Sequence, residues 1–217
     1  EKFAYNGTKV IDNSSYWRMN DEIPLVVPEV NGKSISKSTK IIANPNCSTI
    51  QMVVALNNIY LNYGIKRLVI STYQSVTGTG AAAVQQMEDE RDGKATKKIY
   101  PHQIDQNCFP HGGVFLENGY TTEEIKLVNE TQKIFNDPTI RITATVVRIP
   151  VIGGHCESVN IETLKSFNLD KVIDILNNSA GVIVQDNPKK FDYPMPITSQ
   201  YKNDVFVGRI RIDETIK

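Results

Sequence analysis

The sequence is poor in the features that mark several classes of protein. It has three cysteines, three histidines and 8% aromatic residues, and no stretch approaches the roughly 18 apolar residues of a membrane-spanning helix. Its 24 basic and 24 acidic residues cancel, so it has no electrostatic footprint for nucleic acid or an anionic membrane. The first residues lack the basic-then-apolar plan of a signal peptide. We therefore expect a cytoplasmic protein without a nucleic-acid or membrane partner.

The cysteines are few and widely spaced. An odd number of them (Cys47, Cys108 and Cys156) predicts free thiols in a reducing compartment. Cys108 lies between His102 and His111, but this group lacks the paired short spacings of zinc sites. We expect no metal site.

Hydrophobic periodicity predicts an α+β fold, in which a mixed sheet has flanking helices. Strands are expected at residues 8–12, 41–43, 67–72, 141–149, 158–163, 181–185 and 205–211. Helices are expected at residues 48–63, ending before Gly64, and at 81–90 and 170–178. The charged run at 91–98 is typical of a solvated loop.

A further helix is expected from Thr121. Thr121 and Glu124 fit a capping box, and Ile125, Val128 and Phe135 would form the buried stripe. Glu123 and Lys126 would then face away from that stripe, as an ordinary surface ion pair.

Cys47 is the residue with the clearest chemical signal. It stands at a turn where a helix begins, and the helix dipole and unpaired N–H groups there favour the nucleophilic thiolate. The same N–H groups could hold an oxyanion, and Asn46 offers a further amide donor. A buried structural cysteine is the competing interpretation.

A thiolate nucleophile needs an acid/base partner. His155 follows two glycines between two expected strands, where the backbone can approach a site closely. Arg148, at the end of the preceding strand, could grip a carboxylate with its planar fork or simply lie in solvent. Arg18 has no evident structural requirement, and Gln74 is placed just past a buried strand.

Four segments resemble the aspartate-β-semialdehyde dehydrogenase family: NPNCSTIQMVVAL, STYQSVTGTG, RIPVIGGHCESVNIE and FVGRIR. The upstream DNSSYWRM and PLVVPEVN are similar to the end of that family's nucleotide-binding domain. The resemblance runs from about Val10 to Arg211 with its blocks in the family's order. The combination of N-P-N-C-S-T with a downstream R-x6-H is highly specific.

The resemblance implies a role for each matching residue. Cys47 would be the nucleophile that forms an acyl thioester, and His155 the acid/base. Gln74 would orient the substrate, Arg148 would bind its α-carboxylate, and Glu123 would meet its α-amino group.

It also implies how the remaining groups are bound. Asn46 would contact the substrate, Lys126 and Arg18 would bind phosphate, and Thr77 and Gly78 would touch the cofactor. The implied reaction is the reversible, phosphate-dependent reduction of L-aspartyl 4-phosphate to L-aspartate 4-semialdehyde by NADPH. It serves lysine (through diaminopimelate), threonine and methionine biosynthesis, and a homodimer or tetramer is expected.

The implied architecture is the catalytic domain of glyceraldehyde-3-phosphate-dehydrogenase-like enzymes after a truncated Rossmann-type domain. Residues 1–46 would end the nucleotide-binding domain, and residues 47–217 would form the catalytic and dimerisation domain without its last helix. The family's G-x-x-G-x-x-G loop has no match, since GTGAAA follows the catalytic segment. We expect a piece of a longer protein that is inactive alone.

Other functions stay open. N-acetyl-glutamyl-phosphate reductases share the two-domain plan but would be expected to show a G-C-Y-P-T type motif, where this chain has Asn46-Cys47-Ser48-Thr49. Glyceraldehyde-3-phosphate dehydrogenase has a C-T-T-N signature that is absent. A non-catalytic assembly domain that has lost its cofactor half is the alternative from another class.

Overall fold

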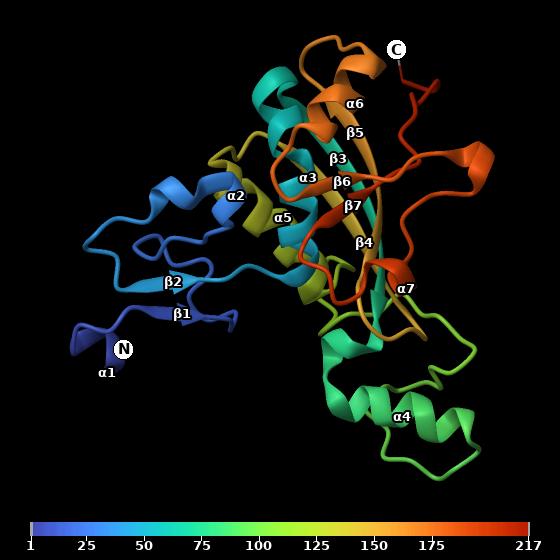
Figure 1. The fold of residues 1–217 in the computed structure, drawn as a ribbon. Coiled ribbons are helices and arrows are strands. Elements are labelled where there is room, and N and C mark those ends of the chain that lie inside the picture. The colour runs from blue at the N-terminus through green and yellow to red at the C-terminus, as the bar shows by residue number, and fades with distance from the viewer. Residues whose placement is uncertain (1, 217) are drawn as a thin grey trace.

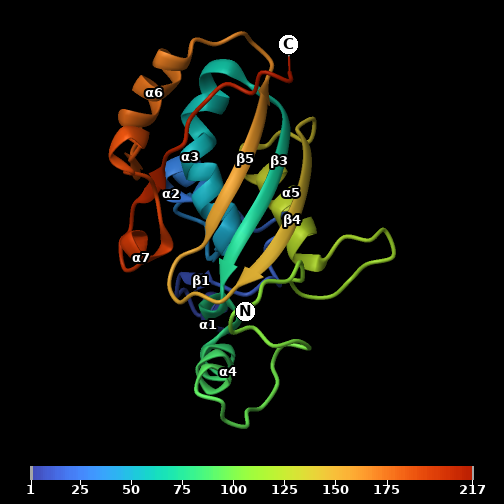
Figure 2. The same ribbon diagram turned by 90° about the vertical axis from the view of Figure 1, so that its right-hand side faces the viewer.

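A mixed sheet in the order β4-β3-β5 forms the centre of the fold. In the computed structural model, which describes residues 2–216, β3 (Ile65–Ser75) pairs in parallel with β4 (Arg141–Ile149) and antiparallel with β5 (Cys156–Thr163). Helices α3 (Cys47–Tyr63) and α5 (Thr122–Phe135) pack against one face (Figure 1). Figure 2 shows the other face, which no helix of the described residues covers. The predicted α+β fold is confirmed.

Smaller elements surround this sheet. Two parallel pairs join β1 (Val10–Asp12) to β2 (Ile41–Ala43) and β6 (Val182–Val184) to β7 (Val205–Val207). The other α-helices are α1 (Lys2–Tyr5), α2 (Pro28–Asn31), α4 (Ala81–Arg91), α6 (Leu169–Asn177) and α7 (Pro196–Ser199). Short 3-10 helices are Gly32–Ser34, Val76–Thr79 and Pro188–Lys190.

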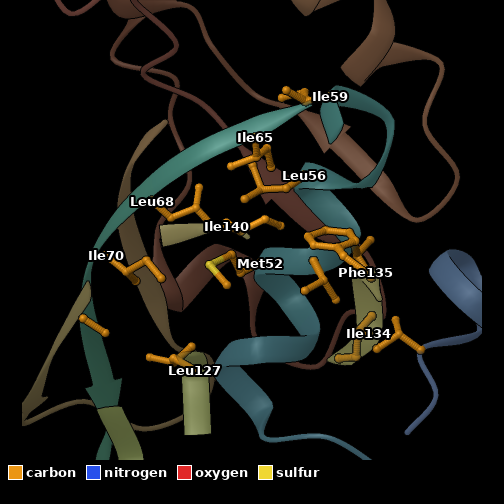
Figure 3. Close-up of a cluster of buried hydrophobic side chains, with 14 of the residues drawn as sticks. Met52, Leu56, Ile59, Ile65, Leu68, Ile70, Leu127, Ile134, Phe135 and Ile140 are labelled. Carbon is orange, nitrogen blue, oxygen red and sulfur yellow. The ribbon is translucent and has the colours of Figure 1, made fainter. Parts of the chain in front are cut away.

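Helix α3 contributes many of the side chains of the main hydrophobic core. The helix is capped by Asn46 and ends before Gly64, whose φ is +66°. Both ends agree with the expected boundaries within one residue. Met52 and Leu56 project from it into a cluster with Leu68 and other apolar side chains (Figure 3). The helix start at Cys47 is thereby held rigidly against the sheet.

The capping box that begins α5 is confirmed, but of the expected buried stripe only Phe135 is buried. Leu127 is fully buried, whereas Ile125 and Val128 are only half-buried. The buried face also carries two acids, Glu124 and Glu130, which disguise it in the sequence.

These acids are buried because backbone N–H groups satisfy them. Glu124 accepts hydrogen bonds from the N–H groups of Thr121 and Val146, and Glu130 accepts one from Asn46. Burial of a carboxylate is tolerated when its lone pairs are matched in this way. The face that packs on the sheet is therefore centred on Leu127 rather than on Ile125 and Val128, and this rotation brings Glu123 and Lys126 near the start of α3.

Several strand boundaries differ from expectation, two of them by three residues or more. Strand β3 continues through Ser75, so Gln74 lies within a strand rather than past it. The strand expected at 205–211 ends at Val207, because Arg209 adopts φ +58° and the Asp186 carboxylate takes the N–H groups of Arg209 and Ile210.

A second, smaller core lies beyond the carboxyl end of β3. Helix α4 packs there against the loop that follows it, through Met87, Tyr100, Ile104 and Phe109. The helix stands apart from the main body in both views (Figures 1 and 2). This satellite core positions Tyr100 beside Arg148.

Leu127→Ala should lower the free energy of unfolding by about 2–5 kcal/mol, because it leaves a cavity in the main core. Ile125→Ala, on the half-buried side of the same helix, should cost distinctly less. Urea denaturation of both variants is the measurement. Equal losses would mean that the helix is rotated relative to the structure.

Candidate active site

Asn46 determines where Cys47 lies. Its Oδ1 accepts hydrogen bonds from the N–H groups of Ser48 (3.0 Å) and Thr49 (3.5 Å), so it caps α3. Its Nδ2 donates to Glu123 (2.8 Å). Cys47 is consequently the first residue of the helix, beside N–H groups that have no intrahelical acceptor.

His155 lies opposite this thiol. Its Nε2 is 3.2 Å from the Cys47 Sγ, and its Nδ1 faces the backbone of Ser75. A Cβ placed on Gly78 would lie 2.9 Å from the ring Cε1 and 3.0 Å from Nε2. The missing side chain of Gly78 therefore leaves the ring the room to reach Cys47.

The resting state of this pair differs from the expected thiolate. Cys47 is exposed to the cavity, but the protein packed around its sulfur limits hydration of a thiolate and raises the pKa of the thiol. The Glu123 and Glu157 carboxyl groups raise this pKa further, and together these effects outweigh the N–H groups of Ser48 and Cys47, which lower it. Burial and the Arg148 charge lower the pKa of His155 to about 4. At neutral pH the pair is a thiol and a neutral imidazole. The expectation from the helix dipole alone is wrong because it omitted the surrounding protein.

Arg148 is the buried cation of the site, with 6% of its surface exposed. Its Nη1 donates to the Ser75 carbonyl (2.7 Å), and its guanidinium lies 5.9 Å from the centre of the Tyr100 ring. The buried Nε has no hydrogen-bond partner among the described residues. Such an unmatched charged donor is what a bound carboxylate would satisfy.

Gln74 belongs to the same buried layer as Arg148, its partner across the β3–β4 pair. Its Nε2 donates to the Ser48 Oγ (3.0 Å), beneath the start of α3. It is thus held at a fixed orientation next to Cys47.

The two expected phosphate ligands are both paired with acids. Lys126 forms an ion pair with Glu123, and Arg18 is 3.0 Å from Glu130 in a buried pair. Arg18 also donates to two backbone carbonyls of the 13–14 turn. Lys126 is the more accessible of the two cations, while Arg18 has an evident structural role that the sequence did not reveal.

All the residues singled out as site residues border one cavity of about 620 Å³. They come from α3, β3, α5, β4 and the loops around them: Arg18, Asn46, Cys47, Gln74, Thr77, Gly78, Glu123, Lys126, Arg148 and His155. The structure thus brings together segments that are more than 100 residues apart in the sequence.

Thr77 and Gly78 form one rim of the cavity, in the 3-10 helix after β3. The Thr77 Oγ1 accepts a hydrogen bond from the Gly153 N–H (2.9 Å), which ties this rim to the loop before His155. The rim presents backbone and a side-chain-free position directly beside Cys47 and His155. The His155 ring takes the space that a Gly78 side chain would need, while the exposed backbone of Thr77 and Gly78 is accessible to the flat ring of a dinucleotide.

The described residues hold no cluster of three or more His, Cys, Asp or Glu that could bind a metal ion. His111 stacks on Phe115, and His102 lies near Phe109. Within the same residues no helix is both long enough and apolar enough to cross a membrane.

Sequence reasoning missed three residues that shape the site. Ser75 contacts His155, Glu130 holds the Asn46 backbone, and Glu157 accepts a hydrogen bond from Gln51 (2.6 Å) beneath Cys47. Glu157 follows His155 by two positions, which was the one local signal for it. The other two depend on contacts that are distant in sequence.

Comparison with known proteins adds independent information. The family profile described as "Semialdehyde dehydrogenase, dimerisation domain" matches residues 56–217, and "Semialdehyde dehydrogenase, NAD binding domain" matches residues 1–38. Aspartate-semialdehyde dehydrogenase of Aquifex aeolicus is 51% identical over 100% of this chain and 66% of its own length. That of Bacillus subtilis is 44% identical over 95% of this chain and 64% of its own.

Solved structures agree. The crystal structure of aspartate semialdehyde dehydrogenase II from Vibrio cholerae superposes with a TM-score of 0.91 at 44% identity, over 98% of this chain and 65% of that one. A second structure of that protein, 43% identical, is described as complexed with ASA. The chain spans slightly less than two thirds of the length of these relatives.

The low pKa of His155 predicts a pH-dependent stability. Between pH 6.5 and about 4 the unfolded chain binds a proton on this ring that the folded protein does not, so stability falls as the pH falls. From pH 7 to pH 5 the loss should be about 2 kcal/mol. His155→Gln should remove that part of the dependence in urea titrations.

His102→Gln is the matched control, since His102 is exposed and should leave the dependence unchanged. Parallel stability curves for His155→Gln and the unmodified protein would contradict a neutral, half-buried ring.

Proposed function

This chain belongs to the aspartate-semialdehyde dehydrogenase family, and from that premise we propose that its cavity catalyses the reversible, phosphate-dependent reduction of L-aspartyl 4-phosphate to L-aspartate 4-semialdehyde with NADPH. The observation that carries the proposal is the Cys47 Sγ, 3.2 Å from His155 Nε2 at the start of a helix, in one cavity with the buried Arg148. The name of the Vibrio cholerae protein and its complex with ASA support the same chemistry.

Cys47 is the nucleophile in this reaction. Its sulfur attacks the β-carbonyl carbon of the acyl phosphate, a C–S bond forms, and the C–O bond to phosphate breaks with its electron pair leaving on phosphate. Negative charge that develops on the carbonyl oxygen meets the N–H groups at the start of α3. The product of this half-reaction is a thioester on Cys47.

His155 manages the proton of the thiol. The ring is neutral at rest and adjoins the sulfur, so it serves as the acid/base group that hydrogen-bonds the thiolate formed when Cys47 loses its proton. Gln74 is buried and hydrogen-bonded to Ser48, and this fixed amide orients the acyl group.

The substrate ends are distinguished by charge and geometry. Arg148 offers a fork with an unmatched Nε to the planar α-carboxylate. Glu123 meets the α-amino group, with Asn46 beside it. Lys126, which leaves its pairing with Glu123, and Arg18 supply positive charge to the phosphate.

The cofactor side of the cavity is the rim formed by Thr77 and Gly78, which would hold the nicotinamide end of NADPH. When bound, that cofactor supplies the hydride that converts the acyl group to the aldehyde. We assign the nucleotide-binding part to residues 1–46 and the catalytic part to residues 47–217. The reaction belongs to the cytoplasmic synthesis of lysine, threonine and methionine.

We also propose a homodimer that forms through the sheet face without a helix cover. That face presents Val69, Ser71 and Tyr73 of β3, and Ser71 lies between Thr145 of β4 and Ser158 of β5. The dimerisation-domain profile over residues 56–217 supports this assignment. A tetramer would be built from such dimers.

Replacing Arg148 by Lys keeps the charge but removes the fork. We expect a loss of about 2–4 kcal/mol in transition-state stabilisation for the semialdehyde. Lys126→Ala should instead raise the KM for phosphate. Steady-state rates of the complete gene product, with semialdehyde and phosphate varied separately, are the measurement.

Arg141→Lys is the matched control, because Arg141 lies on the same strand with its side chain largely in solvent. The assignment of the two ends is reversed if Arg148→Lys alters only the phosphate dependence, or Lys126→Ala only the semialdehyde dependence. Activity near the unmodified level in both variants would refute the proposed site.

Val69→Asp should dissociate the dimer, since it introduces a charge at the centre of the proposed interface. Leu61→Asp places the same charge on α3, where Leu61 is 66% exposed, and should leave the dimer intact. Sedimentation velocity at micromolar concentration distinguishes them. A stable Val69→Asp dimer would exclude this face.

A further inference from the structure

Three atoms of one buried residue, Ser75, face the catalytic machinery. Its N–H donates to His155 Nδ1 (3.0 Å), its hydroxyl lies 3.2 Å from the same nitrogen, and its carbonyl accepts from Arg148. Its exposed fraction is 0%. The hydroxyl also lies 2.7 Å from the Gly153 carbonyl, to which it must donate.

These contacts determine which nitrogen of the neutral ring carries its proton. A backbone N–H can only donate, so Nδ1 must offer a lone pair to Ser75. The proton of the neutral ring, assigned from this network, is then on Nε2 and points to the Cys47 sulfur. The ring approaches the thiol as a hydrogen-bond donor.

The reactive form of the pair needs a different partner for Nδ1. When Cys47 becomes a thiolate, its proton leaves to solvent in the open cavity, because the Nε2 that faces the sulfur already carries a hydrogen. In the thiolate–imidazolium form, the ring has also taken up a proton from solvent on Nδ1 and carries hydrogens on both nitrogens. Nε2–H faces the thiolate, and Nδ1–H requires an acceptor that the Ser75 N–H cannot be. The Ser75 Oγ is within reach and, because its own hydrogen goes to Gly153, presents a lone pair.

We infer that Ser75 is the positioning residue of His155: its N–H holds the neutral ring as a donor toward Cys47, and its buried hydroxyl accepts Nδ1–H when the ring is protonated. The thiolate–imidazolium state is stabilised by this hydroxyl. The inference rests on the proposed function in one respect only, namely which reaction the thiolate carries out.

The charges around the ring make such a partner necessary. Arg148 on β4 disfavours the imidazolium, and Glu123 on α5 favours it. Glu157 on β5 and Glu123 both oppose the thiolate on Cys47. The Ser75 hydroxyl is a neutral acceptor that helps the ring without adding a further negative charge near the sulfur.

The test measures the alkylation rate of Cys47 by iodoacetamide from pH 6 to pH 10, with the modified peptide quantified by mass spectrometry. Ser75→Ala should slow the reaction about tenfold at neutral pH, roughly the cost of a hydrogen bond to a charged group, and shift its profile to higher pH. Ser75→Thr should restore the rate. In a His155→Asn background, Ser75→Ala should have no further effect.

A Ser75→Ala profile equal to that of the unmodified protein would overturn the inference, as would the same slowing in the His155→Asn background. Nitrogen-15 NMR of the unmodified protein gives a check that needs no Ser75 variant, with His155 identified by its absence in His155→Asn. A neutral ring protonated on Nε2 is expected, and protonation on Nδ1 would refute it. Alkylation needs neither substrate nor cofactor, so its result does not depend on whether the protein catalyses the proposed reaction. An absence of that reaction would be detected in a separate activity assay.

Discussion

The hydrogen bond from the Asn46 backbone N–H to the buried Glu130 carboxylate, 2.6 Å long, holds the point at which α3 begins. The Asn46 side chain then caps the helix, and Cys47 follows as its first residue. Glu130 is itself paired with Arg18, so the early 13–18 turn, α5 and α3 meet at one carboxylate. The position of the proposed nucleophile depends on this junction more than on any single apolar contact.

In the free protein, most of the titratable groups in the cavity are either neutral or paired with an opposite charge. Burial raises the pKa of Glu157 to about 8, so this acid carries a proton at neutral pH and opposes the Cys47 thiolate by its charge only at higher pH. Lys126 is paired, and the thiol and imidazole are neutral. Arg148 has a buried Nε without a hydrogen-bond partner among the described residues, and an anionic substrate would satisfy it. In the proposed reaction, the Cys47 thiol and the His155 imidazole become charged only as the substrate reacts. Interactions with these charges therefore stabilise the transition state and not the free protein.

Features that depend on residues close together in the chain could be predicted from the sequence. The limits of α3 follow from Asn46 and Gly64, which adjoin it, and the capping box of α5 follows from Thr121 and Glu124. The burial of Glu130 could not, because its donor, Asn46, is 84 residues away. The expectation that the site residues lie together came from resemblance to a family, since periodicity carries no information on which loops meet, and the structure places these residues around one cavity.

The protonation states of the site residues were the feature that the sequence predicted least well. A helix start beside Cys47 was expected to favour the thiolate, yet Glu123 arrives from another helix and Glu157 from a strand, and both oppose it. The residue roles that the resemblance implies remain proposals at this point. Their shared geometry in one cavity makes them testable together.

The covalent thioester is the most direct test of the proposed chemistry. The complete gene product would be incubated with L-aspartate 4-semialdehyde and oxidised NADP without phosphate, quenched in acid, and digested for mass spectrometry. A β-aspartyl adduct on the peptide that contains Cys47, discharged when phosphate is added before the quench, is the expected result. An adduct on Cys108 or Cys156 instead, or turnover without any adduct on Cys47, would contradict it.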